Sequence, residues 1–427
     1  MVQQQIAAET ISLTRAPLFG PVELLRAPVH LEAARRIDLV AHFSGAFDLA
    51  EGQPIGHAAR VAHLALAFAR ELKLDSASRR RVVYAALLHD AGVAIRDLPP
   101  GVDGTGGHTA AGAWLASLIG LDQETQHVIR CTHERWDGDG RPARLVMSDI
   151  PIEALAITAA HWVTDLLGPL DNPLRARAAL RAFPLDELEP LVGLRVARAA
   201  MEQLRQDGVW MALWDEQLSE RVAEQAPGEG RASIQHVEHV ASAMGVMIDS
   251  AVRERGRSEL VADLAFELGR QLGMEATHGR ALRVAALVMD IGQLGVPRHI
   301  TEKPAILSID EMELMRRHPG WAARLLETLP GFEEVALWVE SHHERPDGRG
   351  YPDLLTQTEI PLAARVLAVA DAYWALRAPR PYRDALNAEG ATAVIEEASG
   401  TQFDAGVAAA LRRALRAIEA RARSSVA

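Results

Sequence analysis

The sequence predicts an all-α protein made of two helical bundles that are related by internal duplication. Apolar residues recur at helical spacing in both halves of the 427-residue chain. Stretches about 200 residues apart also share many letters in the same register, and no segment shows the sustained period-two alternation that β-strands require. These observations predict the fold class, and the chain is long enough for two domains.

The duplication appears as a constant offset between matching segments. Residues 56–74 (GHAARVAHLALAFARELKL) lie 200 residues before 256–274 (GRSELVADLAFELGRQLGM). From His108 and His318 onward the offset is 210, so the second copy has ten extra residues between 293 and 317. A register kept over more than a hundred residues indicates that the two halves are homologous.

The repeat divides the chain into two domains and a connecting stretch. Prolines in the first segment favour an irregular arm, and an Ala-Pro-Gly-Glu-Gly run ends the short helix that tryptophan spacing predicts in the connection. The expected parts are an N-terminal arm (1–30), a first domain (31–205), a linker (206–232) and a second domain (233–427).

Apolar side chains mark one helical face at the same place in each copy. They are Val61, Leu64, Phe68 and Leu72 in the first copy and Val261, Leu264, Leu268 and Leu272 in the second. Steps of three or four residues are typical of an amphipathic helix. The two faces therefore predict equivalent core helices.

Charge and composition exclude several classes of protein. The net charge of −12 and the pI of about 5.8 disfavour a general binder of nucleic-acid polymers or membrane surfaces, because no basic field attracts phosphates. A small anionic ligand remains compatible with local basic clusters. The single cysteine, Cys131, fits a reducing compartment, and neither a signal peptide nor a long apolar run is found. We expect a soluble, cytoplasmic protein.

Histidines and one aspartate stand at repeated spacings in the first copy. They are His57, His89, Asp90, His108, His133 and His161. Imidazole and carboxylate bind zinc, iron and manganese, and an adjacent His-Asp pair lets one helix end contact two ions. Two ions about 3.5–4 Å apart can bridge a hydroxide and hold a phosphodiester during in-line attack. The pattern predicts a metal site with Asp90 as its catalytic carboxylate.

A plainer interpretation is that these side chains are a relic that binds nothing. A lone histidine is usually an ordinary polar residue, and His42, His63 and His127, which have no matching histidine in the second copy, fit that description. The spacings of the larger set recur at matching positions of the second copy. This recurrence favours the metal site.

Longer motifs resemble a known family. The segments H-x3-V-A, H-D-x-G and a later histidine are followed by HHERPDGRGYP (342–352), IPLAARVLAVADAY (360–373) and RPYR (380–383) in the better-preserved second copy. Together they are similar to the HD-GYP branch of the HD-domain metal phosphohydrolases. The resemblance implies two tandem HD-domain-like bundles. It also implies cyclic di-GMP phosphodiesterase activity with two or three bound metal ions, usually iron or manganese. Many members of that family are degenerate and act as sensors or docking partners.

In the first domain the resemblance implies metal ligands at the six positions named above. His161 stands where the family has a final aspartate, which the second copy keeps as Asp371. Thr132 replaces the first histidine of the His-His-Glu run, Val93 replaces a lysine after the His-Asp pair, and Arg141 replaces the tyrosine of Gly-Tyr-Pro. Imidazole can replace carboxylate as a ligand, with altered charge and metal preference.

In the second domain the replaced residues belong to the His-Asp part of the motif, and the Gly-Tyr-Pro part is kept. Arg257 and Met289 replace two histidines, and Gln293 replaces the lysine. Arginine stays protonated and cannot bind a cation, so a full dinuclear site is not expected there, although one ion could be held. The retained positions of this degenerate site are Asp290, His318, His342, His343 and Asp371.

The second domain also keeps residues that the resemblance assigns to ligand binding. Tyr351 could stack on a guanine, and Arg380 and Arg383 could bind phosphate oxygens. The same loop could serve to dock a signalling protein. Alternatively it is only a tight turn, which Gly348 and Gly350 permit.

Three functions remain open from the sequence. The first is a metal-dependent phosphohydrolase or cyclic di-GMP phosphodiesterase of weak activity, with one or two Fe, Mn or Zn ions in the first domain and none required in the second. The second is an inactive regulatory module that binds a cyclic dinucleotide or docks a signalling partner. The third is a structural pseudo-dimer that binds only protein.

Overall fold

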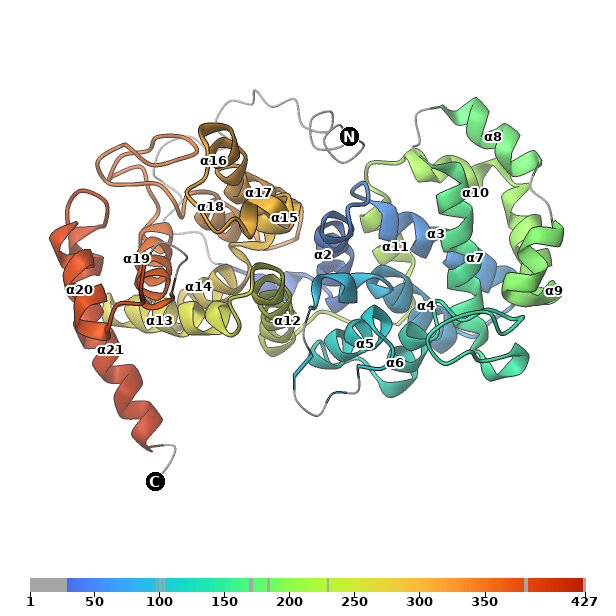
Figure 1. Cartoon of the computed structure of the whole chain (residues 1–427), viewed down its shortest axis with the longest axis horizontal. Helices are drawn as coiled ribbons and strands as arrows, with labels where there is room; N and C mark the ends of the chain where they lie inside the picture. The colour runs from blue at the N-terminus through green and yellow to red at the C-terminus, as the bar shows by residue number, and fades with distance from the viewer. Residues whose placement is uncertain are drawn as a thin grey trace. The chain divides into compact units, whose positions relative to one another are not determined.

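A computed structural model describes residues 29–96, 98–99, 102, 104–168, 172–182, 185–228, 230–379 and 383–424 (Figure 1). The expected arm at 1–30 lies outside these residues apart from its last two positions. The described residues form helices and turns, with isolated β-bridges and no strand. The prediction of an all-α fold is therefore confirmed.

The described chain separates into two compact units. The N-terminal unit comprises residues 35–232, and the C-terminal unit comprises residues 29–34 together with 233–424. The stretch expected as a linker, 206–232, forms short helices inside the N-terminal unit. Within the described residues, no helix combines the length and apolar character needed to cross a membrane.

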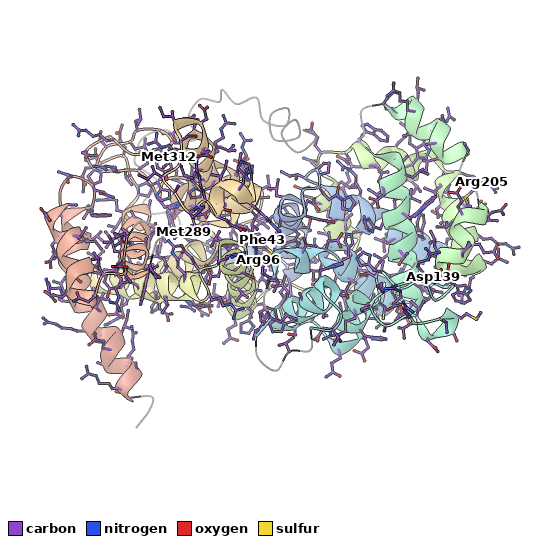
Figure 2. The ribbon with its side chains drawn as sticks, viewed as in Figure 1. Phe43, Arg96, Asp139, Arg205, Met289 and Met312 are labelled. Carbon is purple, nitrogen blue, oxygen red and sulfur yellow. The ribbon has the colours of Figure 1, made fainter. Side chains whose placement is uncertain are left out.

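The N-terminal unit is a bundle in which α3 packs against α4 and α7, and α7 packs against α9. The predicted apolar face of α3 is buried in this core, and Phe43 of α2 is 1% exposed (Figure 2). Its elements are α2 (Arg36–Glu51), α3 (His57–Glu71), α4 (Ser76–Leu88), η3 (Ala91–Ala94), α5 (His108–Leu118), α6 (Gln123–Arg130), η4 (Met147–Asp149), α7 (Ile152–Leu167), α8 (Pro173–Arg181), α9 (Leu185–Leu204), α10 (Asp207–Met211), η5 (Ala212–Trp214) and α11 (Leu218–Gln225).

The C-terminal unit repeats this plan, with α13 packed against α14 and α19. Its elements are η2 (Leu31–Ala33), α12 (Ile234–Val252), α13 (Arg257–Gln271), α14 (Ala276–Val288), η6 (Ile291–Gly295), α15 (Arg298–Thr301), α16 (Ile309–Met315), α17 (His318–Glu327), α18 (Glu333–Glu340), α19 (Leu362–Arg377), α20 (Ala388–Glu397) and α21 (Ala405–Ser424).

The ten extra residues of the second copy lie in the region that forms α15 and α16. Leu307, Leu314 and Met315 of this segment pack against a buried cluster that includes Ile300 and Trp321. The insertion is therefore folded onto the bundle through its own apolar contacts and does not interrupt the helices that the two copies share.

In each unit a glycine lets the turn after one core helix lie against the start of another: the turn after α4 meets α5, and the turn after α14 meets α17. A Cβ atom at Gly92 would lie 1.9 Å from the carbonyl oxygen of His108, and one at Gly292 would lie 2.1 Å from that of His318. No side chain fits at either position, because real Cβ atoms do not approach backbone oxygens so closely. The close approach places each histidine beside the aspartate two residues before the glycine.

We expect Gly292→Ala to destabilise the C-terminal unit by about 1–3 kcal/mol, because the added methyl group forces the backbone apart. The matched control is Gly320→Ala in α17, whose Cβ would meet nothing within 4 Å. Alanine should there be neutral or stabilising by about 0.5–1 kcal/mol. Urea unfolding followed by circular dichroism measures both changes. Equal unfolding midpoints for the two variants would contradict the close approach.

Candidate functional site

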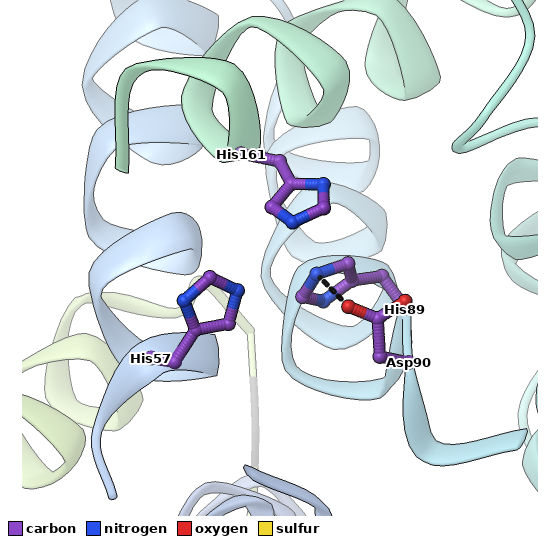
Figure 3. A group of neighbouring side chains, drawn as sticks. All are labelled: His57, His89, Asp90 and His161. Atoms are coloured by element: carbon purple, nitrogen blue, oxygen red, sulfur yellow. Dashed lines mark ion pairs between the residues drawn. The ribbon is translucent and has the colours of Figure 1, made fainter. Parts of the chain in front are cut away.

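Three helices of the N-terminal unit bring one group of ligands together (Figure 3). His57 is the first residue of α3, His89 ends α4 and is followed by Asp90, and His161 lies within α7. One ligating atom from each of the four residues lies within 4.8 Å of the others. Residues more than a hundred positions apart in the sequence therefore face one point.

A second group shares the same aspartate. His108 opens α5, His133 lies in the turn after α6, and both have a ligating atom within 4.8 Å of Asp90 and of each other. The structure thus brings together all six residues that the sequence singled out in this domain. Whether they hold metal stays a prediction.

The two carboxylate oxygens of Asp90 are divided between the groups. Oδ2 lies 2.7 Å from His89 Nε2, whereas Oδ1 lies 3.3 Å from His133 Nε2 and 3.6 Å from His108 Nε2. A carboxylate that offers one oxygen to each of two neighbouring ligand groups is arranged to bridge two cations.

The buried donor set fits a metal ion. His57 Nε2 is buried and has no hydrogen-bond partner, whereas the buried atoms His89 Nε2 and Asp90 Oδ2 contact each other as an ion pair. A buried polar atom without a partner costs about 1–3 kcal/mol, so an unpaired imidazole nitrogen that faces this pair indicates a missing ligand. His89 Nδ1 donates to the carbonyl oxygen of Ala86 at 2.7 Å, which directs Nε2 toward the site.

The electrostatics of the site favour neutral imidazoles at His57 and His161 and a charged imidazole at His89, beside a strongly acidic carboxyl group. Burial lowers the pKa of His57 to about 4 and that of His161 to about 3. Burial alone would also lower the pKa of His89, but the charge of Asp90 raises it to about 9. The pKa of Asp90 is lowered despite burial, chiefly by His89 and His133. The field that draws a proton to His89 would equally draw a cation.

Sequence reasoning missed an acidic residue beside this site. Glu51 ends α2, and burial followed by the charge of Asp90 raises the pKa of its carboxyl group to about 8. Nothing in the second copy corresponds to it at the same spacing, so the repeat gave no signal. Two carboxyl groups this close hold at least one proton between them unless a cation separates them.

Sequence reasoning also missed two aspartates that fix the helix start carrying His57 or Arg257. Asp48 accepts hydrogen bonds from the backbone N–H groups of Gly56 and Ala58, at 2.7 and 3.0 Å, and so fixes the start of α3 around His57. Asp249 accepts from the N–H of Ser258 at the start of α13 in the same way. An aspartate eight or nine residues before the helix start in both copies was the available signal.

The repeated phrase His-Glu-Arg-x-Asp-Gly-x-Gly forms the same loop in both units. The buried Glu134 accepts from the N–H groups of Ala143 and Leu145, at 2.5 and 2.9 Å. Glu344 repeats this with Asp353 and Leu355, at 2.6 and 3.0 Å. The neighbouring arginine of each phrase also pairs with its aspartate. The loop holds the histidine before the glutamate, so this part of the phrase is structural.

The C-terminal unit carries the degenerate version of the site. Arg257 opens α13 and forms ion pairs with Asp290, at 3.0 Å, and with Asp371 of α19. Met289, which is labelled in Figure 2, stands in place of the histidine before the aspartate. It is 1% exposed and supplies no ligand. Compared with the N-terminal unit, this group therefore has a permanent positive charge in place of one imidazole and an apolar side chain in place of another.

Three histidines of the C-terminal unit still form a compact group. One ligating atom from each of His318, His342 and His343 lies within 4.8 Å of the others. The Nδ1 atoms of His318 and His342 donate to the carbonyl oxygens of Met315 and Val339, and their Nε2 atoms lie 3.4 Å apart. In neutral rings both Nε2 atoms carry lone pairs, so this group could hold one cation.

The predicted ligand-binding residues lie in different settings. The Tyr351 ring stacks on His343 with centroids 4.8 Å apart, and the Arg316 guanidinium lies 5.4 Å from the ring centroid. Arg383 donates to the carbonyl oxygens of Ala375 and Leu376 near the end of α19, so part of its guanidinium serves the backbone. Arg380 lies outside the described residues.

Comparison with known proteins agrees with this geometry. Two family profiles, both described as HD domain, match residues 55–164 and 243–407. The cyclic di-GMP phosphodiesterase response regulator RpfG of Xanthomonas campestris is 34% identical over 275 residues, which is 62% of this chain and 68% of that protein. The chain belongs to the HD-GYP family. Its two units are thus an HD-GYP tandem.

Two further comparisons concern proteins of Vibrio cholerae. A 3'3'-cGAMP-specific phosphodiesterase is 30% identical over 310 residues, which is 71% of this HD-GYP chain and 66% of the relative. The chain thus spans about two thirds of the length of these curated relatives. A crystal structure of a cyclic GMP-AMP-specific phosphodiesterase has a TM-score of 0.65 at 22% identity and covers 90% of this chain and 98% of that one. At this identity the likeness concerns the fold.

We expect Glu134→Gln and Glu344→Gln to destabilise their units by about 1–3 kcal/mol each, because an amide oxygen cannot serve both N–H groups while its NH₂ group finds a partner in the same buried place. Glu202→Gln, on an exposed side chain, is the control and should change stability by less than about 0.5 kcal/mol. Urea unfolding gives all three values. If the Glu134 and Glu344 variants matched the control, the loops would be held in some other way.

Proposed function

We propose that the N-terminal unit is a metal-dependent phosphodiesterase that acts on a cyclic dinucleotide. The observation that carries the proposal is the buried carboxylate of Asp90, which directs one oxygen toward each of two histidine groups. The substrate class is supported by the relatives, whose names assign them to cyclic di-GMP and 3'3'-cGAMP. A cytoplasmic location fits such a substrate and the single cysteine.

The residues divide into a buried and an accessible part. His57 and His89 are buried, whereas the side chains of His108 and His133 are 40% and 28% exposed. A phosphodiester therefore reaches the site from the side of His108 and His133, and the buried residues hold the far side. Two bound ions would supply Lewis-acid stabilisation of the phosphate charge and an activated water.

The donor set bears on the choice of metal. The two candidate ligand groups contain five imidazoles and the carboxylate of Asp90, because His161 stands where the family has an aspartate, and the carboxyl group of Glu51 lies beside them. Imidazole suits zinc and iron, and carboxylate suits the harder manganese ion. Among Fe, Mn and Zn we therefore favour zinc or iron, with two ions that share Asp90.

We expect purified protein to contain about one or two ions in the N-terminal unit and to hydrolyse cyclic di-GMP or 3'3'-cGAMP. Replacing His89→Ala together with Asp90→Ala should remove those ions and lower turnover by more than about a hundredfold, since loss of supporting residues alone can cost that much. Elemental analysis and chromatography of the nucleotide products measure the two effects.

The matched control for this experiment is His127→Ala, an exposed histidine of the same unit that lies outside both ligand groups. It should leave metal content and turnover unchanged. A protein that binds no metal and leaves both dinucleotides intact would rule out the enzyme.

A second candidate function is a regulatory module in the C-terminal unit. It is favoured by the contrast between a lost His-Asp end, where Arg257 and Met289 stand, and a retained loop in which Tyr351 contacts His343 and Arg316. Such a unit would bind a cyclic dinucleotide without cleaving it, or dock a signalling protein through the Gly-Tyr-Pro loop.

Calorimetric titration with cyclic di-GMP tests this second function in the His89→Ala, Asp90→Ala background, where the N-terminal site is disabled. Binding should be lost on Tyr351→Ala, because the aromatic contact is removed, and kept on Arg413→Ala, an exposed residue of α21. Absence of binding in the background protein would leave only protein docking for this unit.

A further inference from the structure

One arginine of the C-terminal unit lies among three carboxylates. Arg257 Nε lies 2.9 Å from Glu254 Oε2, Nη1 lies 3.0 Å from Asp290 Oδ2, and Nη2 contacts Asp371 Oδ1. Its side chain is 14% exposed and those of Asp290 and Asp371 are 8% and 15% exposed. Such a well-shielded set of negative charges needs a cation close by.

The same point in the N-terminal unit is a ligand site. Arg257 matches His57, Asp290 matches Asp90, and Asp371 matches the position of His161. In the N-terminal unit those three positions, with His89, converge within 4.8 Å on a candidate ion. In the C-terminal unit Arg257, at the first position, instead forms ion pairs directly with Asp290 and Asp371.

The remaining neighbours agree with a permanent internal cation. Gln293, in place of a family lysine, donates from Nε2 to Asp290 Oδ1 at 2.6 Å, and His318 Nε2 lies 3.3 Å from the same oxygen. Met289 removes the imidazole that would have been a fourth ligand and fills its place with an apolar side chain. Both carboxylate oxygens of Asp290 and Oδ1 of Asp371 therefore have a partner from the protein.

We propose that the Arg257 guanidinium is a built-in replacement for a metal ion in the C-terminal unit. It links the start of α13, the turn after α14 and the middle of α19, which are the three elements that an ion would otherwise join. The group formed by Arg257, Asp290 and Asp371 takes no metal, and the packing of the unit does not depend on one. The three-histidine group of His318, His342 and His343 faces the other oxygen of Asp290, and the proposal does not extend to it. The inference stands independently of whether the N-terminal unit is an enzyme.

Removal of the guanidinium tests the structural part of the proposal in the full chain. Arg257→Met keeps the length of the side chain and leaves Asp290 and Asp371 without their cation. Hydrogen–deuterium exchange of peptides from α13 and α19 should become at least tenfold faster, whereas Arg413→Met, on an exposed arginine, should leave it unchanged. Unchanged exchange in Arg257→Met would overturn the proposal.

Restoration of ligands tests the claim that the arginine occupies an ion position. In the His89→Ala, Asp90→Ala background, the added pair Arg257→His and Met289→His should bind one more Mn²⁺ or Zn²⁺ per chain than the background protein does. Chelation with EDTA should then speed exchange of α13 and α19 in the restored variant and leave it unchanged in the background protein. A restored variant that folds and takes up no additional ion would overturn the proposal, as would a loss of metal from the background protein on Asp371→Ala.

Discussion

Each unit buries the carboxylate of one aspartate at the turn after α4 or α14, and the rest of the site must compensate for its charge. Asp90 and Asp290 are both shielded from water by the helices around them, and an isolated carboxylate in such a place would be costly. Positive charge or hydrogen-bond donors must face it. The N-terminal unit surrounds its aspartate with imidazoles that suit an ion, and the C-terminal unit faces its aspartate with a guanidinium and an amide.

The scaffold around this aspartate is separate from the chemistry that it carries. Gly92 and Gly292 allow the close approach of α5 and α17. Glu134 and Glu344 accept backbone hydrogen bonds that fix the loop carrying a histidine. These contacts involve backbone atoms and recur in both copies. Side chains that face the aspartate could therefore change from histidine to arginine or methionine while the helices kept their places. This separation explains how one fold can hold two different interiors.

The sequence predicted the all-α fold and the kinship of the halves because both follow from spacing alone. It also singled out the six residues that meet around Asp90, since their intervals recur in the second copy. Three features were out of reach. Glu51 has no counterpart at the same spacing, the backbone contacts of Glu134 leave no mark in the sequence beyond a glutamate, and the reach of Arg257 across to Asp371 depends on how α13 and α19 pack. The sequence showed that Arg257 cannot bind a cation, and the geometry adds that its guanidinium pairs with Asp290 and Asp371.

The segment that forms α15 and α16 ends on Arg316, two residues before His318, and that arginine reaches the ring of Tyr351. The N-terminal unit has glycine, Gly106, two residues before His108, and arginine, Arg141, where the tyrosine would be. Tyrosine and its basic neighbour are thus present together in one copy and absent together from the other. Tyr351 and Arg316 thus form one contact, and placing the aromatic residue in the N-terminal unit without the inserted helices would transfer only half of it.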